Sequence, residues 1–117
     1  MTHVLHAFIQ REFYNTVKIG DKIKFAEEVR PYVVKAIGKR YIICTKPFNL
    51  KHTVLYTIID KEGFVRGADN MVFCLGYETL EQIKDNLERL ETGEMDISYR
   101  NVINLNIEQV IKGKDNE

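Results

Sequence analysis

The sequence predicts a single α+β domain built on a strongly bent antiparallel sheet. Three observations predict this class: short apolar segments alternate with polar residues at period two, tight turns separate the early segments, and one later segment repeats its apolar residues at helical spacing. A small SH3-like barrel, with the helix covering one side, is one architecture of this kind. The 117 residues fit one domain, 1–117, without a repeat or a linker.

The first segments predict a short helix followed by a strand. Residues 2–15 carry apolar side chains near helical spacing and favour an amphipathic helix, with a strand as the alternative. In TVKIGDKIKF, residues 16–25, apolar and lysine residues alternate on both sides of Gly20 and Asp21. That alternation predicts a strand interrupted by a turn or bulge.

Two hairpins and a further strand are expected in the middle of the chain. Their segments share β-branched and aromatic residues bounded by turn residues, and a glycine ends the second loop where a positive φ is needed. The first hairpin joins residues 30–37 and 40–45 through a turn at 38–39. The second joins residues 54–60 and 64–66 through a loop that ends at Gly63, and the further strand is residues 71–75.

One amphipathic helix and a closing strand complete the predicted fold. Residues 80–91 repeat leucine and isoleucine at spacings of three and four, Thr79 heads a capping box, and Gly93 suits a left-handed C-cap. Residues 103–107 alternate apolar and polar side chains and predict a last strand with one wet face. The charged tail, 113–117, is expected to fray.

Charge and hydropathy restrict the partners. The formal net charge is zero, but basic residues are in excess from 15 to 66 and acidic residues from 67 to 117. Such a layout favours an anionic ligand on one face, although a solvated surface gives the same counts. No segment has the length of a membrane span, and the first thirteen residues lack a secretory signal's apolar run, so we expect a cytoplasmic protein without membrane contact.

The sequence offers little for catalysis or metal binding, so we predict no catalytic residue, no metal and no cofactor. Cys44 and Cys74 each lie in an apolar run and predict buried, reduced thiols. His3 and His6 have the spacing of a metal pair but no third ligand nearby in sequence. The pair of carboxylates at 27–28 is interpreted as solvated surface.

Two polar segments that follow strands form the candidate binding site. KPFNLKHT, residues 46–53, surrounds an aromatic ring with hydrogen-bond donors, and RGADN, residues 66–70, contains an arginine suited to a bidentate clamp. If the strand ends after Cys44 and Val65 meet, the segments share a pocket for a nucleotide or another anion. The predicted ligand-binding residues are Lys46, Phe48, Asn49, His52, Arg66 and Asn70, with Arg100 as a weaker addition.

Each candidate also has a structural interpretation. Phe48 can fill the core, and Asn49 and Asn70 can bond their own backbones in turns. Arg66 can pair with Asp60 or Asp69 on the surface. The sequence leaves both interpretations open.

Several segments of the chain resemble a family of small phage- and prophage-encoded proteins of Gram-positive bacteria. These segments are TVKIGDKIKF, YIICTKPFNLKHTVLYTIID, GFVRGADN, and the predicted helix with the SYRN residues that follow it. The similarity extends from Lys18 to about Ile107, and CTKPFNLKHTVLYTI is its most recognisable part. Residues 1–14 lie outside it and are variable in such proteins. The resemblance implies an accessory phage protein in the cytoplasm of a bacterial host and implies no particular activity.

Three functions compatible with these observations differ in class. The first is a non-catalytic antagonist of host antiviral defence that sequesters a small nucleotide-type immune signal, with a homo-oligomer as one way to enclose the ligand. The second is an anti-CRISPR-like inhibitor that binds a protein of a host defence complex. The third, a small nucleic-acid-binding module, is disfavoured by the zero net charge.

Overall fold

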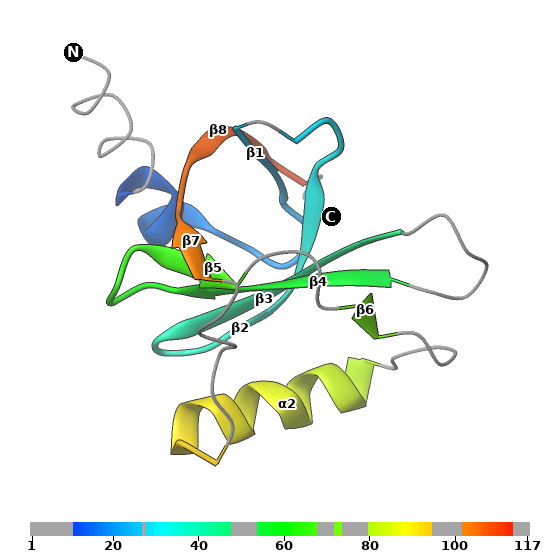
Figure 1. Ribbon diagram of the computed structural model, residues 1–117, viewed down its shortest axis with the longest axis vertical. Coiled ribbons are helices and arrows are strands. Elements are labelled where there is room, and N and C mark those ends of the chain that lie inside the picture. The colour runs from blue at the N-terminus through cyan, green and yellow to red at the C-terminus, as the bar shows by residue number, and fades with distance from the viewer. Residues whose placement is uncertain are drawn as a thin grey trace.

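The protein folds as a curled antiparallel sheet with one long helix against its convex face (Figure 1). The computed structural model describes residues 11–26, 28–47, 54–67, 72–73, 80–94 and 102–113. Residues 11–16 are helical. The other elements are β1 (Lys22–Phe25), β2 (Tyr32–Ile37), β3 (Tyr41–Pro47), β4 (Val54–Asp60), β5 (Val65–Gly67), β6 (Val72–Phe73), α2 (Leu80–Thr92), β7 (Val102–Asn104) and β8 (Ile107–Ile111).

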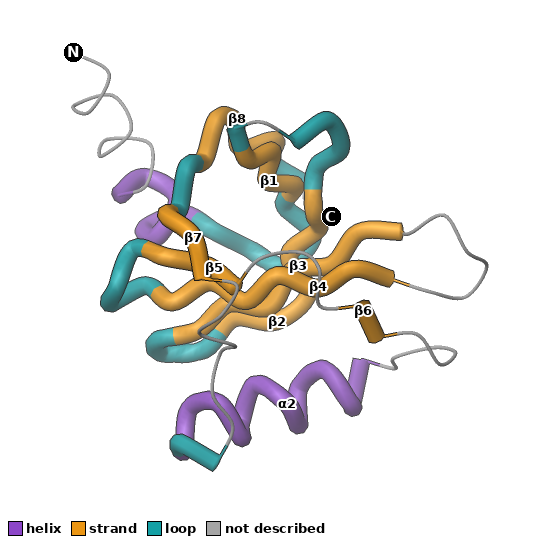
Figure 2. The backbone as a smooth tube through the Cα atoms, viewed as in Figure 1, coloured by secondary structure: helices purple, strands orange, loops and turns teal. Residues whose placement is uncertain are grey.

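The order of the strands explains the curl. Along the sheet the strands run β7-β5-β4-β3-β2-β1-β8, with β6 added beside β4. β7 and β8 therefore lie at opposite ends of this path, although only Leu105 and Asn106 separate them in the chain. Three Cα–Cα steps from Asn104 to Ile107 span at most about 11 Å, so the two ends of the sheet must approach each other. Figure 2 shows the resulting half-barrel of strands.

The connection between β7 and β8 is held on both sides. The backbone N–H of Leu105 donates to the carbonyl of Phe64, and the N–H of Ala26 donates to the carbonyl of Asn106. The sequence predicted one strand at 103–107, and that prediction is wrong because the chain changes pairing partner at this corner. The apolar alternation continues through the corner, since Leu105 and Ile107 are both buried.

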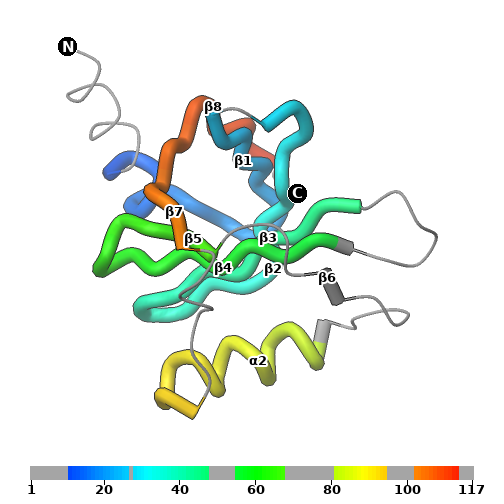
Figure 3. Tube along the Cα trace, viewed as in Figure 1, coloured from blue at the N-terminus to red at the C-terminus, as the bar shows by residue number. Residues whose placement is uncertain are grey.

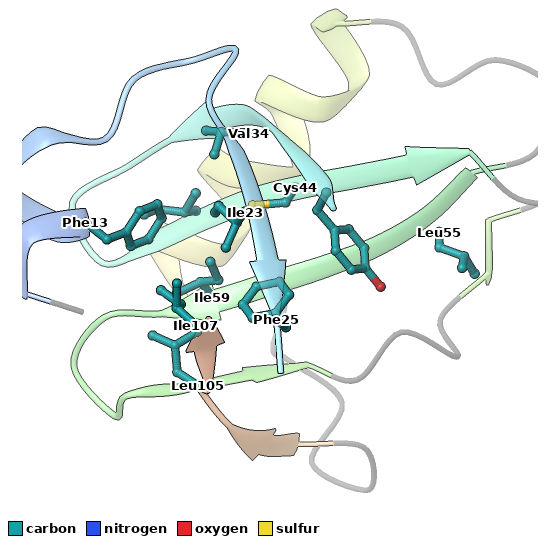
Figure 4. Close-up of a cluster of buried hydrophobic side chains, with 11 residues drawn as sticks. Phe13, Ile23, Phe25, Val34, Cys44, Leu55, Ile59, Leu105 and Ile107 are labelled. Atoms are coloured by element: carbon teal, nitrogen blue, oxygen red, sulfur yellow. The ribbon is translucent and has the colours of Figure 1, made fainter. Parts of the chain in front are cut away.

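The curled sheet separates two apolar clusters. The concave cluster combines side chains of the helical segment, of β1 to β4, and of β8 with the connection that precedes it, and Figure 4 shows most of them crowded between the strands. Its fully buried members include Phe13, Ile23, Val34, Ile59 and Ile107. Leu55 lies apart from the main group, toward the other end of the concave face.

The convex cluster joins α2 to the strands beneath it. Ile83 and Leu90 of the helix pack on Ile43 and Ile58, the side chains that alternate with those of the concave face. The helix predicted at 80–91 is confirmed, and Gly93 follows it with a φ of 85°, as predicted for a left-handed C-cap. Thr79, the predicted cap, lies outside the described residues.

The two predicted hairpins are confirmed, with one correction to their turns. β2 and β3 pair in antiparallel register, as do β4 and β5. In the second loop the positive φ falls on Phe64, at 55°, and not on Gly63 as the sequence predicted. The ring of Phe64 packs 5.6 Å from that of Tyr14, and its carbonyl accepts from Leu105, so tertiary contacts hold this conformation.

The strand predicted at 16–25 is confirmed only from Lys22 onward. The backbone N–H of Lys18 donates to the Asp21 carboxylate and the N–H of Asp21 donates to the Lys18 carbonyl, which closes a turn through Gly20. Ile19, predicted to alternate inward, is 60% exposed as a result. Of the predicted N-terminal helix, residues 2–10 lie outside the described part and residues 11–15 are helical.

Asp21 also ties this turn to the end of β8. Its buried carboxylate accepts from the N–H of Gly113 at 2.9 Å and from the ammonium of Lys112 at 2.6 Å. β1 and β8 consequently run side by side although they lie far apart in the chain (Figure 3). Burial alone would raise the pKa of Asp21, but these hydrogen bonds and that of Lys18 outweigh burial and lower the pKa.

The lowered pKa of Asp21 predicts an acid-dependent contribution to stability. A depressed pKa in the folded state means that the stabilisation is complete above the unfolded pKa of about 3.9 and is lost as the pH falls through the folded value. Asp21→Asn should therefore be less stable than wild type at pH 7, with the difference shrinking toward pH 2. Urea titrations across this range measure it. The control is Asp85→Asn, at an exposed position of α2. The prediction would be contradicted if the free energies of unfolding of wild type and Asp21→Asn changed in parallel with pH.

Close packing at Gly38 gives a second prediction. Glu91 of α2 accepts from the backbone N–H groups of Arg40 and Tyr41, and a Cβ on Gly38 would overlap its carboxylate. Gly38→Ala should cost about 1–3 kcal/mol by displacing this acceptor. Thermal unfolding checks the loss against Gly63→Ala, whose added Cβ meets only ordinary contacts at 3.4 Å or more. Equal stability of the two variants would show that Glu91 does not hold the hairpin.

Candidate functional site

Two of the predicted ligand-binding residues lie in the described part of the chain, and both face the concave side of the sheet. They are Lys46 and Arg66, which stand opposite Leu55 and Ile59 in the strand register. Phe48, Asn49, His52, Asn70 and Arg100 lie outside the described residues. Their part in a binding site stays a prediction.

Arg66 is buried inside the half-barrel. Its side chain is 2% exposed, and its guanidinium lies 3.9 Å from the centre of the Phe25 ring. Nη2 donates to Glu28 Oε2 at 2.5 Å, and Nη1 donates to the hydroxyl of Thr57 at 3.1 Å. Thr57 in turn donates to the Gly67 carbonyl. The cation is therefore held by a carboxylate, a hydroxyl and an aromatic face.

Lys46 approaches the same carboxylate from β3. Its Nζ donates to Glu28 Oε1 at 3.2 Å and lies 4.5 Å from the centre of the Tyr32 ring. The side chain is 8% exposed. Lys46 and Arg66, the first residues of the two predicted polar segments, therefore both form an ion pair with Glu28.

Glu28 is the site residue that sequence reasoning missed. It follows β1 on the connection to β2, and its side chain is 16% exposed, so the interpretation of this carboxylate as solvated surface is wrong. A signal was present: Lys46 falls in phase with the inward positions Ile42 and Cys44. A cation at an inward position needs a carboxylate partner, since a buried charge without one is costly.

The surface pairing of Arg66 with Asp60 is also wrong. Asp60 lies on the other face of β4 and accepts from Nε and Nη2 of Arg40, each at 2.9 Å. Arg40 lowers the pKa of Asp60 through these bonds, against burial, and the N–H of Glu62 lowers it further. Asp69, the other surface partner considered, lies outside the described residues.

One donor of Arg66 lacks a hydrogen-bond partner. The Nε atom is buried and no acceptor within the described chain reaches it. A buried N–H without an acceptor costs about 1–3 kcal/mol, more for a charged group. The interior of the concave side therefore holds a buried, cationic N–H donor without an acceptor, close to the rings of Phe25 and Tyr32.

Cys44, which lies near Arg66 on the concave side, is not suited to act as a nucleophile. Burial raises the pKa of the Cys44 thiol far above its usual range, outweighing the nearby charge of Arg66, so this cysteine is a packed thiol as predicted.

Among the described residues, no cluster of three or more histidine, cysteine, aspartate or glutamate side chains could hold a metal. No helix in the same part of the chain has the length and apolarity to cross a membrane.

Comparison of the chain with protein-family models, with curated proteins and with solved structures finds no match.

The burial of Arg66 predicts a large cost for its removal. Arg66→Met leaves Glu28 in the interior with one of its two cations, and breaking a buried pair costs about 3–5 kcal/mol. Adding Glu28→Gln to this variant should restore part of the loss. Urea denaturation measures both. The control is Arg89→Met, which removes an exposed pair with Asp85 and should change stability by less than about 0.5 kcal/mol; a similar small effect at Arg66 would refute the buried cluster.

Proposed function

We propose that the protein is a non-catalytic phage accessory protein that sequesters a small nucleotide-type anion in the cytoplasm of a bacterial host. In this proposal the curled sheet is an SH3-like barrel, and the ligand enters the polar end of its concave face. Such sequestration would antagonise a host defence that signals through a nucleotide. The resemblance to phage proteins supplies the context, and the concave face supplies the chemistry.

The unsatisfied Nε–H of Arg66 carries the proposal. A phosphate oxygen accepting from this donor would remove the cost of leaving it unpaired inside the protein. The guanidinium is also fixed in advance by Glu28, Thr57 and the Phe25 ring, so little side-chain entropy would be lost on binding.

The surroundings of Arg66 suit the rest of a nucleotide. Lys46 adds a second cation within reach of the same carboxylate, and the rings of Phe25 and Tyr32 provide apolar surface beside both. The segments 46–53 and 66–70 begin at these two cations and supply the further predicted contacts from Phe48, Asn49, His52 and Asn70. Arg100 precedes β7, the strand paired with β5.

Thermal shift against linear nucleotides, cyclic nucleotides and inorganic phosphate tests the proposal. A ligand at a hundredfold excess over its Kd stabilises the folded state by about 2.7 kcal/mol, which raises Tm by about 10 °C in a domain of this size. Lys46→Met should reduce the shift, because it removes one cation and leaves Arg66 and Glu28 paired. Lys84→Met on the exposed side of α2 is the matched control. A flat panel, or an equal shift in Lys46→Met, would refute the proposal.

A protein-binding inhibitor of a host defence complex is the second candidate. The observation that favours it is the position of β8 at an end of the sheet, where another chain can pair. A nucleic-acid module has less support, because the net charge is zero and Lys24, one of the basic residues that could contact a phosphate, pairs with Glu108.

A further inference from the structure

β8 offers an open edge to a second chain. Within the described residues it pairs only with β1, through a register from Lys22 opposite Ile111 to Phe25 opposite Ile107. Its outer edge therefore carries backbone groups that no described strand engages. Exposed edges of this kind are templates for strand addition.

A groove of about 360 Å³ runs beside this edge. One wall is the helical segment, through Glu12, Phe13 and Thr16, and the other is β8 with Lys112. Three consecutive residues of β8, 108–110, line the groove. Side chains of consecutive strand residues point to opposite faces, so all three can border one groove only if it follows the edge of the strand.

The groove has an apolar floor and an acidic rim. Phe13 and Val110 are its apolar lining residues, and Glu12 and Glu108 are its carboxylates. Lys112 does not offset them, because its ammonium donates to the Asp21 carboxylate and to the carbonyl of Thr16, each at 2.6 Å. Glu12 has no ion pair with any residue of the described chain, whereas Glu108 shares its charge with Lys24.

We propose that this groove, between residues 12–16 and β8, binds an extended segment of a partner protein that adds to the sheet as a strand. The segment carries apolar side chains toward the half-buried Val110 and a lysine or arginine beside Glu12. Its backbone pairs with the outer edge of β8.

Charge argues against a second copy of this chain as the occupant. Strand pairing of β8 with β8 of another copy would follow a two-fold axis and bring the same rim against itself. The acidic rims of the two copies, each with Glu12 and Glu108, would then lie near each other, and like charges repel. A basic segment avoids this repulsion.

Selection from a display library of random twelve-residue peptides, with the full chain as target, tests the inference. We expect enrichment of peptides that alternate β-branched with polar residues and contain lysine or arginine. Fluorescence anisotropy of an enriched peptide should then show binding at least tenfold weaker to Thr16→Trp, whose side chain fills the groove. Asn15→Trp is the matched control, because its neighbouring exposed position does not line the groove. Glu12→Lys should weaken binding of the cationic peptides at least fivefold.

Three results would overturn the inference. One is the absence of any enriched peptide, and another is equal affinity of wild type, Thr16→Trp and Asn15→Trp for an enriched peptide. The third is self-association of the wild type in analytical ultracentrifugation that Thr16→Trp abolishes, since the groove would then hold a second copy. Circular dichroism of each variant separates loss of the groove from loss of the fold.

Discussion

The two-residue connection between β7 and β8 is the constraint on which the rest of the structure depends. It joins the two ends of a seven-strand path, so the sheet cannot lie open. Leu105 and Asn106 are bonded to Phe64 on one side and Ala26 on the other, which fixes the corner. The curl that follows gives the sheet a concave face with its own core and leaves the convex face to α2.

The curl also accounts for the buried charges. On a flat sheet, Arg66 and Lys46 would extend into solvent, but on the concave face they are surrounded by Phe25 and Tyr32. The connection from β1 to β2 crosses this end of the face and supplies Glu28. This polar cluster restricts the position of the connection between β1 and β2, because each carboxylate oxygen of Glu28 accepts a hydrogen bond from a cation on another strand.

Local patterns predicted the strands, the two hairpins and the helix, but not the contacts between segments far apart in the chain. β3 and β4 are nearly continuous apolar runs because both of their faces are buried, and the period of α2 follows from its contact with them. The corner at 105–106 was missed because Leu105 and Ile107 keep the same alternation while their strands change partners. Glu28 was missed for a related reason: its partners are 18 and 38 residues away, and no local spacing encodes them.

β5 connects the two surfaces to which we assign binding. Arg66 reaches from this strand to Glu28 across the concave face, while its backbone pairs with Ile103 of β7. β7 leads through Leu105 and Asn106 into β8, whose outer edge borders the groove. β5 is paired to β7 along all three of its residues. The two-residue connection that follows keeps the start of β8 near β7, so one short run of backbone links the strand that holds Arg66 to the edge that borders the groove.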